Sequence, residues 1–209
     1  MEQSKKIGWS LLLVFGLMAV SGISQASASK KSKTKEQASK VEKANEAEEN
    51  IIPNGDFEDG NEDGSLPEFW QFLKASGAEG TISWENSGAF SAKYCVKLIK
   101  NNSATYCRLQ TIGKKITPIT GVPYIFQCQI KGSAGKMAFI AITTYDKSTP
   151  RKFVGAFTLN LKIIQDNKWE LMEKELIFKE DVDMVMVELR VMAQDETVSY
   201  DNVSLRKKK

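Results

Sequence analysis

From about residue 90 onward, apolar and polar residues alternate over short stretches that are separated by turn-forming residues. Seven such stretches occur, at 93–99, 105–112, 123–131, 137–145, 169–178, 185–193 and 198–205. A period of two residues is typical of strands that bury one face. The breaks, such as "PNG", "TGVP" and "GSAGK", are rich in Gly, Pro, Asn and Ser. We therefore expect an all-β fold, an antiparallel β-sandwich, rather than strands that alternate with helices.

The alternation also separates the side chains of each strand into a core face and an outward face. The expected core residues are Cys107, Leu109, Tyr124, Phe126, Cys128, Ile130, Val185, Val187, Leu189 and Val191. The expected outward residues include Tyr106, Arg108, Gln110, Ile125, Gln127, Gln129, Lys131, Met186, Glu188, Arg190 and Met192. This outward set is richer in Gln, Arg and Tyr than a solvated strand face, which is usually rich in Lys and Glu. A shift of register by one residue would exchange the two faces.

Residues 1–28 have the pattern of a secretory signal peptide. Lys5 and Lys6 precede an apolar run at 7–20, and the small residues of "ASA" at 26–28 offer a cleavage site. The run has 14 residues, whereas a membrane-spanning helix needs about 20. We expect a secreted, periplasmic or cell-envelope protein without a stable membrane span; an uncleaved N-terminal anchor is the alternative.

Residues 29–50 form a charged segment with Lys in its first half and Glu in its second. It contains no aromatic residue and one β-branched aliphatic residue, Val41, so it cannot bury enough apolar surface to fold alone. We interpret it as a flexible linker to a single folded domain at 51–209.

Composition excludes several kinds of chemistry. The 209 residues contain no His, which removes His-based general bases, His metal ligands and Ser-His-Asp triads. The net charge is only +3, because 29 basic residues are balanced by 26 acidic ones, so we expect no nucleic-acid partner. Three Cys are present without a CxxC pair, which argues against a zinc site. Cys107 and Cys128 are both expected to face the core, where they would form either a disulfide or two buried thiols.

Four segments in order resemble a known family. They are "IIPNGDFEDG…LPEFW", "SGAFSAKYCVKL", "ITGVPYIFQCQIKGSAG" and "TVSYDNVSLR", and the resemblance extends over essentially all of 51–209. Together they resemble the carbohydrate-binding modules of the family 4 and 9 type, the CenC-like modules of the galactose-binding-like superfamily. The resemblance implies a jelly-roll sandwich, a sugar-binding cleft on one concave sheet face and a structural calcium ion.

The resemblance also implies which residues hold this calcium. Glu58 follows the Phe of "NGDFEDG" and Asp201 precedes the terminal "NVSL", and both match calcium ligands of the family pattern. The backbone carbonyl of Asp56 would be a third ligand, with another from the turn near Ala92 or Lys93. Calcium prefers six to eight oxygen ligands of this kind. A calcium-free turn, in which Asn and Asp bind their own backbone, is the alternative.

Saccharides are bound by aromatic rings together with amide, guanidinium and carboxylate groups, against mostly apolar walls. Eight residues are the candidates for such a face: Tyr106, Arg108, Gln110, Gln127, Gln129, Tyr145, Glu188 and Arg190. Each is also compatible with a structural role, for example as a cross-strand charge pair.

We therefore expect a secreted, non-catalytic module that binds a polysaccharide or oligosaccharide. A separate glycoside hydrolase or an envelope component would be its protein partner, since no catalytic domain is evident in the chain. An envelope structural or protein-interaction module with the same fold is the first alternative. A small glycoside hydrolase that pairs Glu188 with Glu58 or Asp201 is the second.

Overall fold

The structure, a computed structural model, describes residues 49–103, 105–179 and 182–209. Ten strands and no helix lie in these residues. The strands are β1 (Trp70–Lys74), β2 (Gly80–Glu85), β3 (Cys95–Lys100), β4 (Cys107–Thr111), β5 (Pro123–Gly132), β6 (Met137–Tyr145), β7 (Phe153–Lys162), β8 (Glu170–Ile177), β9 (Met184–Val191) and β10 (Glu196–Lys207). All seven expected strands are present, and β1, β2 and β7 are three that the sequence analysis did not predict.

The described residues do not test the predictions for the N-terminal region. The signal peptide at 1–28, and the linker at 29–50 except for its last two residues, lie outside the described residues. Among the residues that are described, no helix is long and apolar enough to span a membrane.

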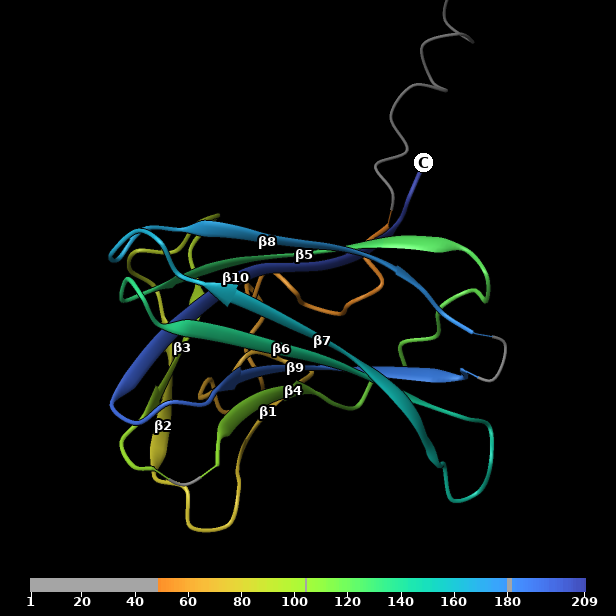
Figure 1. Ribbon diagram of the computed structural model, residues 1–209, viewed down its shortest axis with the longest axis horizontal. Helices are drawn as coiled ribbons and strands as arrows, with labels where there is room; N and C mark the ends of the chain where they lie inside the picture. Colours follow the sequence, from red (N-terminus) through yellow and green to blue (C-terminus); the bar gives the residue numbers. More distant parts are fainter. Residues whose placement is uncertain (1–48, 104, 180–181) are drawn as a thin grey trace, which may run out of the picture. The chain divides into compact units, whose positions relative to one another are not determined.

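The strands form two antiparallel five-stranded sheets that pack face to face (Figure 1). The first sheet has the order β1-β4-β9-β6-β7, and the second sheet has the order β2-β3-β10-β5-β8. Strands that are adjacent in a sheet are mostly distant in sequence, because the chain crosses repeatedly between the two layers. The predicted all-β antiparallel sandwich is therefore confirmed.

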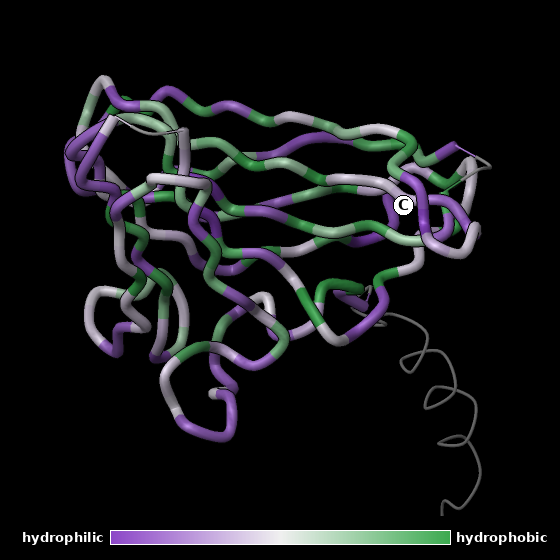
Figure 2. Tube along the Cα trace, turned by 90° about the horizontal axis from the view of Figure 1, so that it is seen from below, coloured by the Kyte–Doolittle hydropathy of each residue, from purple (hydrophilic) through white to green (hydrophobic). Residues whose placement is uncertain are grey.

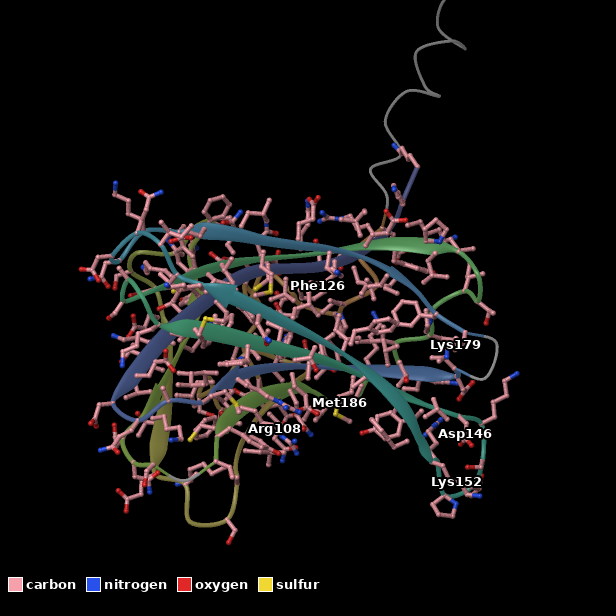
Figure 3. All side chains as sticks on the ribbon, viewed as in Figure 1. Arg108, Phe126, Asp146, Lys152, Lys179 and Met186 are labelled. Atoms are coloured by element: carbon pink, nitrogen blue, oxygen red, sulfur yellow. The ribbon has the colours of Figure 1, made fainter. Side chains whose placement is uncertain are left out.

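The core lies between the two sheets and is built from the residues that alternation assigned to it. Leu109, Val187 and Leu189 of the first sheet, and Phe126 and Ile130 of the second, have no exposed surface. Phe126 points into the space between the layers in Figure 3. Figure 2 shows hydrophobic and hydrophilic residues that alternate along the strands, as expected when each strand buries one side. Burial of such a side chain stabilises the fold by about 1.5–3 kcal/mol.

The turn "NGDFEDG" attaches the beginning of the domain to its last strand. The Gly55 carbonyl accepts a hydrogen bond of 2.7 Å from the Val203 amide, at the bulge of β10. Phe57 is fully buried, packs edge-on against Trp70 at 5.2 Å between ring centroids, and accepts a 2.8 Å hydrogen bond from the Trp84 indole at its carbonyl. The single aromatic of this polar turn is thus the residue that anchors the turn in the core.

The three cysteines are buried and unpaired. Cys107 lies on β4 of the first sheet and Cys128 on β5 of the second, so the disulfide alternative is not observed. Burial raises the pKa of all three thiols, which keeps them in the unreactive protonated form.

Candidate functional site

Outward residues of the first sheet line up in rows across β4, β9 and β6. Arg108 lies opposite Arg190, and Arg190 lies opposite Phe139. In the next row Gln110 lies opposite Glu188, and Glu188 lies opposite Ala141. We call these two rows, with the adjoining Tyr106, the polar rows. In Figure 3, Arg108 and Met186 of this sheet lie on the side away from Phe126.

Glu188 joins the two arginines of the polar rows. Its Oε2 atom accepts hydrogen bonds from Arg108 Nη1 at 3.1 Å, Arg190 Nε at 2.9 Å and Arg190 Nη2 at 2.6 Å. Glu188 retains only 3% of its surface although it occupies an outward position. A buried carboxylate is stable only when it is paired and hydrogen-bonded, and the two guanidiniums supply both.

Tyr106 lies directly before β4 and is covered by the same two arginines. The guanidinium carbon of Arg190 is 4.9 Å from the ring centroid of Tyr106, and that of Arg108 is 5.6 Å away. Arg108 Nη1 also donates to the Tyr106 hydroxyl at 3.2 Å. Contacts of a cation with an aromatic ring orient both partners. The ring therefore positions the guanidiniums, and part of its own surface is unavailable for stacking.

Two polar atoms of the polar rows have no partner. Arg108 Nε and Gln110 Oε1 are buried and without a hydrogen bond to any of the described residues. Gln110 as a whole is 8% exposed. A buried donor or acceptor without a partner costs about 1–3 kcal/mol. One is a donor and the other an acceptor, and both are groups that pair with sugar hydroxyls.

The far end of the same face is aromatic. Tyr145 lies opposite Met184 on β9 and meets Phe153 of β7 edge-on, with ring centroids 6.2 Å apart. Phe153 is 61% exposed. Met184 is six positions from Arg190, which corresponds to about 20 Å along a strand. The face thus combines polar groups at one end with exposed aromatic surface at the other.

Gln127 and Gln129 do not belong to this face. Both are on β5, which lies in the second sheet, and Gln127 donates a 2.7 Å hydrogen bond to Glu173 on β8. The expectation of one face with eight residues is therefore wrong for these two. Alternation identifies an outward residue, but it does not tell which of two sheets carries it.

The outer side of the second sheet has a surface pocket of about 250 Å³. Its lining includes Glu85, Lys97, Lys131 and Ser199, and Lys97 pairs with Glu85 at 3.2 Å. Lys131 Nζ lies 4.5 Å from the ring centroid of Trp169, next to the pocket. The pattern of the sequence indicates neither Lys97 nor the pocket, because the lining comes from five separate segments.

The predicted calcium ligands meet at one turn. Glu58 Oε1 accepts hydrogen bonds from the amides of Lys93 and Tyr94 at 2.9 and 2.8 Å. Asp201 Oδ2 accepts from the amides of Phe90 and Ser91 at 2.8 and 3.0 Å. The two carboxylates, which are 143 positions apart in the sequence, therefore hold the same turn, at 90–94.

The charges at this turn are compatible with a hard cation. Burial raises the pKa of Asp201, and the negative charge of Glu58 raises it further. Two carboxylates and nearby backbone carbonyls are the oxygen donors that calcium prefers, and a cation between them would relieve their repulsion. The side chain of Asp56 is exposed, and the ligand predicted from this residue is its backbone carbonyl. Within the described residues, no group of three or more Asp, Glu, Cys or His side chains is arranged so that it could hold a metal ion.

Comparison with known proteins supports the fold. No family model matches the chain, and no curated protein matches its sequence. Among solved structures, a family 16 carbohydrate-binding module has a TM-score of 0.51 and 18% identity over 75% of this chain and 99% of that one. A structure described as CBM4 has a TM-score of 0.52 and 16% identity, again over 75% and 99% of the two chains.

The enzymatically active domain of tailspike protein 4 of bacteriophage CBA120 has a TM-score of 0.62 at 12% identity. The match covers 76% of this chain and only 21% of the tailspike chain. At these identities the similarity concerns the fold alone. Most of these neighbours are described as carbohydrate-binding modules.

Proposed function

We propose that this chain is a non-catalytic carbohydrate-binding module that binds a polysaccharide or oligosaccharide on the outer face of the first sheet. The observation that carries the proposal is the arrangement of Tyr106, Arg108, Gln110, Glu188 and Arg190 in the polar rows. Four of them, Tyr106, Arg108, Glu188 and Arg190, are fixed by one another before any ligand arrives, which lowers the entropy cost of binding.

The order of the sequence motifs supports the finer assignment to the family 4 and 9 type. The sandwich topology is shared with solved carbohydrate-binding modules. Tyr145, with Phe153 beside it, would add the apolar contact that a sugar ring needs. A linear saccharide that extends along β9 could reach both ends of the face.

We further propose that a structural calcium ion is held by Glu58, Asp201 and the carbonyl of Asp56. Its contribution would be to neutralise the two carboxylates where the first turn meets β10. The chain's own residues already prepare this arrangement, because Glu58 and Asp201 fix the 90–94 turn from both sides.

The positions of the carboxylates do not favour a glycoside hydrolase. Such enzymes need two carboxyl groups on either side of one glycosidic bond. Glu188 is on the first sheet and is bonded to two arginines, whereas Asp201 is on the second sheet and Glu58 is bonded to the 93–94 amides. We propose a secreted or envelope location, with residues 29–50 as a tether and a separate glycoside hydrolase or envelope protein as partner.

A glycan array probed with the purified protein tests the proposed function. We expect binding to at least one poly- or oligosaccharide, and we expect Tyr106→Ala and Arg108→Ala each to weaken that binding about tenfold or more. Loss of a hydrogen bond to a charged group costs about 1.5–3 kcal/mol, which corresponds to roughly 10- to 150-fold in affinity.

Gln129→Ala is the matched control, because Gln129 is an outward strand residue of the second sheet. It should bind as the wild type does, and thermal melts should show that all three variants are folded. An array without any bound glycan would favour the protein-interaction module instead. Equal binding by wild type, Tyr106→Ala and Arg108→Ala would move the site away from this face.

A further inference from the structure

The proposed binding face carries an excess of positive charge at its polar end. Arg108 on β4 and Arg190 on β9 occupy directly opposed positions in the ladder. Like charges directly opposite each other destabilise a sheet. The repulsion between the two arginines therefore lowers the stability of the sheet, and an anion placed against both guanidiniums would remove this repulsion.

The residues nearby only partly compensate the two arginines. Glu188 supplies one carboxylate to two guanidiniums, and it does so through a single oxygen atom. Besides Arg108, Glu188 and Arg190, the described strands of the first sheet have one more charged residue at an outward position. It is Lys162, which lies on β7 on the same face as Asn160. The face thus presents three cations and one carboxylate, and that carboxylate is almost fully buried.

Arg108 has an unused hydrogen-bonding site. Its Nη1 donates to Glu188 and to the Tyr106 hydroxyl, while its Nε is buried without an acceptor. The planar guanidinium matches the two oxygens of a carboxylate or sulfate with a pair of parallel hydrogen bonds. A small rotation of Arg108 toward such a group would give Nε the acceptor that it lacks.

We propose that this face selects an anionic saccharide, with the carboxylate or sulfate group of a sugar residue bound between Arg108 and Arg190. Tyr106 keeps both guanidiniums in place through its ring, and Glu188 keeps them from moving apart. The inference rests on the proposed function and adds to it the class of saccharide. A neutral glycan would leave the excess charge of the arginine pair uncompensated.

Affinity electrophoresis of the purified protein tests this inference with three soluble polymers. Polygalacturonate carries carboxylates, dextran sulfate carries sulfates, and dextran is neutral. We expect strong retardation by at least one of the two polyanions and at least about tenfold weaker binding to dextran. Retardation by polygalacturonate alone would assign the anion as a carboxylate, and retardation by dextran sulfate alone would assign it as a sulfate.

A matched pair of variants separates a built site from general charge attraction. Arg190→Gln and Lys168→Gln each remove one positive charge, but Lys168 is an exposed residue in the loop before β8, next to the second sheet. Arg190→Gln should weaken polyanion binding about tenfold, whereas Lys168→Gln should change it less than about twofold. Equal losses in both variants would overturn the inference, because net charge alone would explain them.

Glu188→Gln gives a readout that a merely structural role would not produce. The glutamine amide oxygen can still accept hydrogen bonds from the two guanidiniums and so keep them in place, but the negative charge that competes for them is lost. Binding to the polyanion should therefore become tighter even if the melting temperature falls. Weaker polyanion binding by folded Glu188→Gln would contradict the proposal.

The result also distinguishes this inference from the function on which it rests. Suppose that the protein binds neutral glycans as tightly as polyanions, and that Arg190→Gln does not change the ratio of the two affinities. This result would overturn the selection of anionic saccharides and leave the proposed function standing. No binding to any of these polymers, together with an empty glycan array, would overturn both.

Discussion

Phe57 has a backbone conformation that aromatic residues rarely adopt. Its φ of 60° lies in the left-handed region, which is costly for a residue with a large side chain. The surroundings compensate for this, because the ring is fully buried against Trp70 and the carbonyl binds the Trp84 indole. The conformation turns the chain so that the ring enters the core while Glu58 points to the 90–94 turn.

Gly55 is the residue of this turn that tolerates a side chain least. A Cβ atom there would lie 1.9 Å from the carbonyl oxygen of Val203, which is backbone and cannot move away. We expect Gly55→Ala to lower the free energy of unfolding by about 1–3 kcal/mol, the usual cost of overpacking, as measured by denaturant titration.

Asp56→Ala is the control for Gly55→Ala. It changes the next residue, whose side chain is exposed, and keeps the backbone carbonyl. A wild-type unfolding midpoint for Gly55→Ala would show that the first turn is not packed on β10 as described.

At the scale of single strands, alternation predicted most of the sandwich because each strand buries one side. The polar strand β2, "GTISWE", was missed because it offers few apolar residues, and the short β1, "WQFLK", was missed because Phe72 and Leu73 interrupt the alternation. Strand β7, "FVGAFTLNLK", does alternate from Phe157 to Leu161, so its signal was present in the sequence.

The local pattern of a strand does not reveal which of the two sheets the strand belongs to. Gln110 on β4 and Gln127 on β5 have the same alternation, yet they lie on the outer sides of opposite sheets. The alternation predicts that Arg108, Glu188 and Arg190 face outward, but it does not predict the hydrogen bonds between them. These bonds depend on the pairing of β4 with β9, which brings together Arg108 and Glu188 from positions 80 residues apart. Long-range register of this kind follows from packing of the whole core, not from any one segment.

Asp183 connects three segments next to the first sheet. It lies just before β9, and its carboxylate binds Lys115 at 2.8 Å and Arg151 at 3.6 Å. The hydrogen bond from Lys115, together with the charges of Lys115 and Arg151, lowers the pKa of Asp183 below its usual 3.8. A carboxyl group with a lowered pKa stabilises the fold above its ordinary pKa, and this contribution is lost as the pH falls through the lowered value.

We therefore expect Asp183→Asn to lower the melting temperature at neutral pH by about 2 °C, because the ion pairs are partly exposed. The difference from wild type should shrink as the pH falls below 3.8. Asp195→Asn, which changes an exposed carboxylate on a loop, is the control. A difference that stays constant down to acid pH would refute the ionic origin of the effect.

At the scale of the whole domain, the first turn and the last strand are joined by polar contacts that a cation would complete. If calcium binds at Glu58 and Asp201, it binds only the folded state and must raise the melting temperature. At a calcium concentration of about 100 times Kd the stabilisation is about 2.7 kcal/mol, or roughly 5–11 °C for a domain of this size.

Thermal melts in calcium and in EDTA measure this difference directly. We expect the wild type to melt at a lower temperature in EDTA, and Asp201→Asn to melt at the same temperature in both. Asp59→Asn, on the acidic loop beside Glu58, should retain the wild-type difference. Identical wild-type melts in the two buffers would mean that the turn is held by its hydrogen bonds alone.

The central claim is that the outer face of the first sheet binds saccharide. An NMR titration of the isotope-labelled protein with the glycan selected by the array tests it most directly, because amide shifts report the position of the ligand. The account predicts shifts concentrated at Arg108, Gln110, Glu188 and Arg190 on β4 and β9. Shifts concentrated instead around Lys97, Lys131 and Trp169 on the second sheet would contradict it.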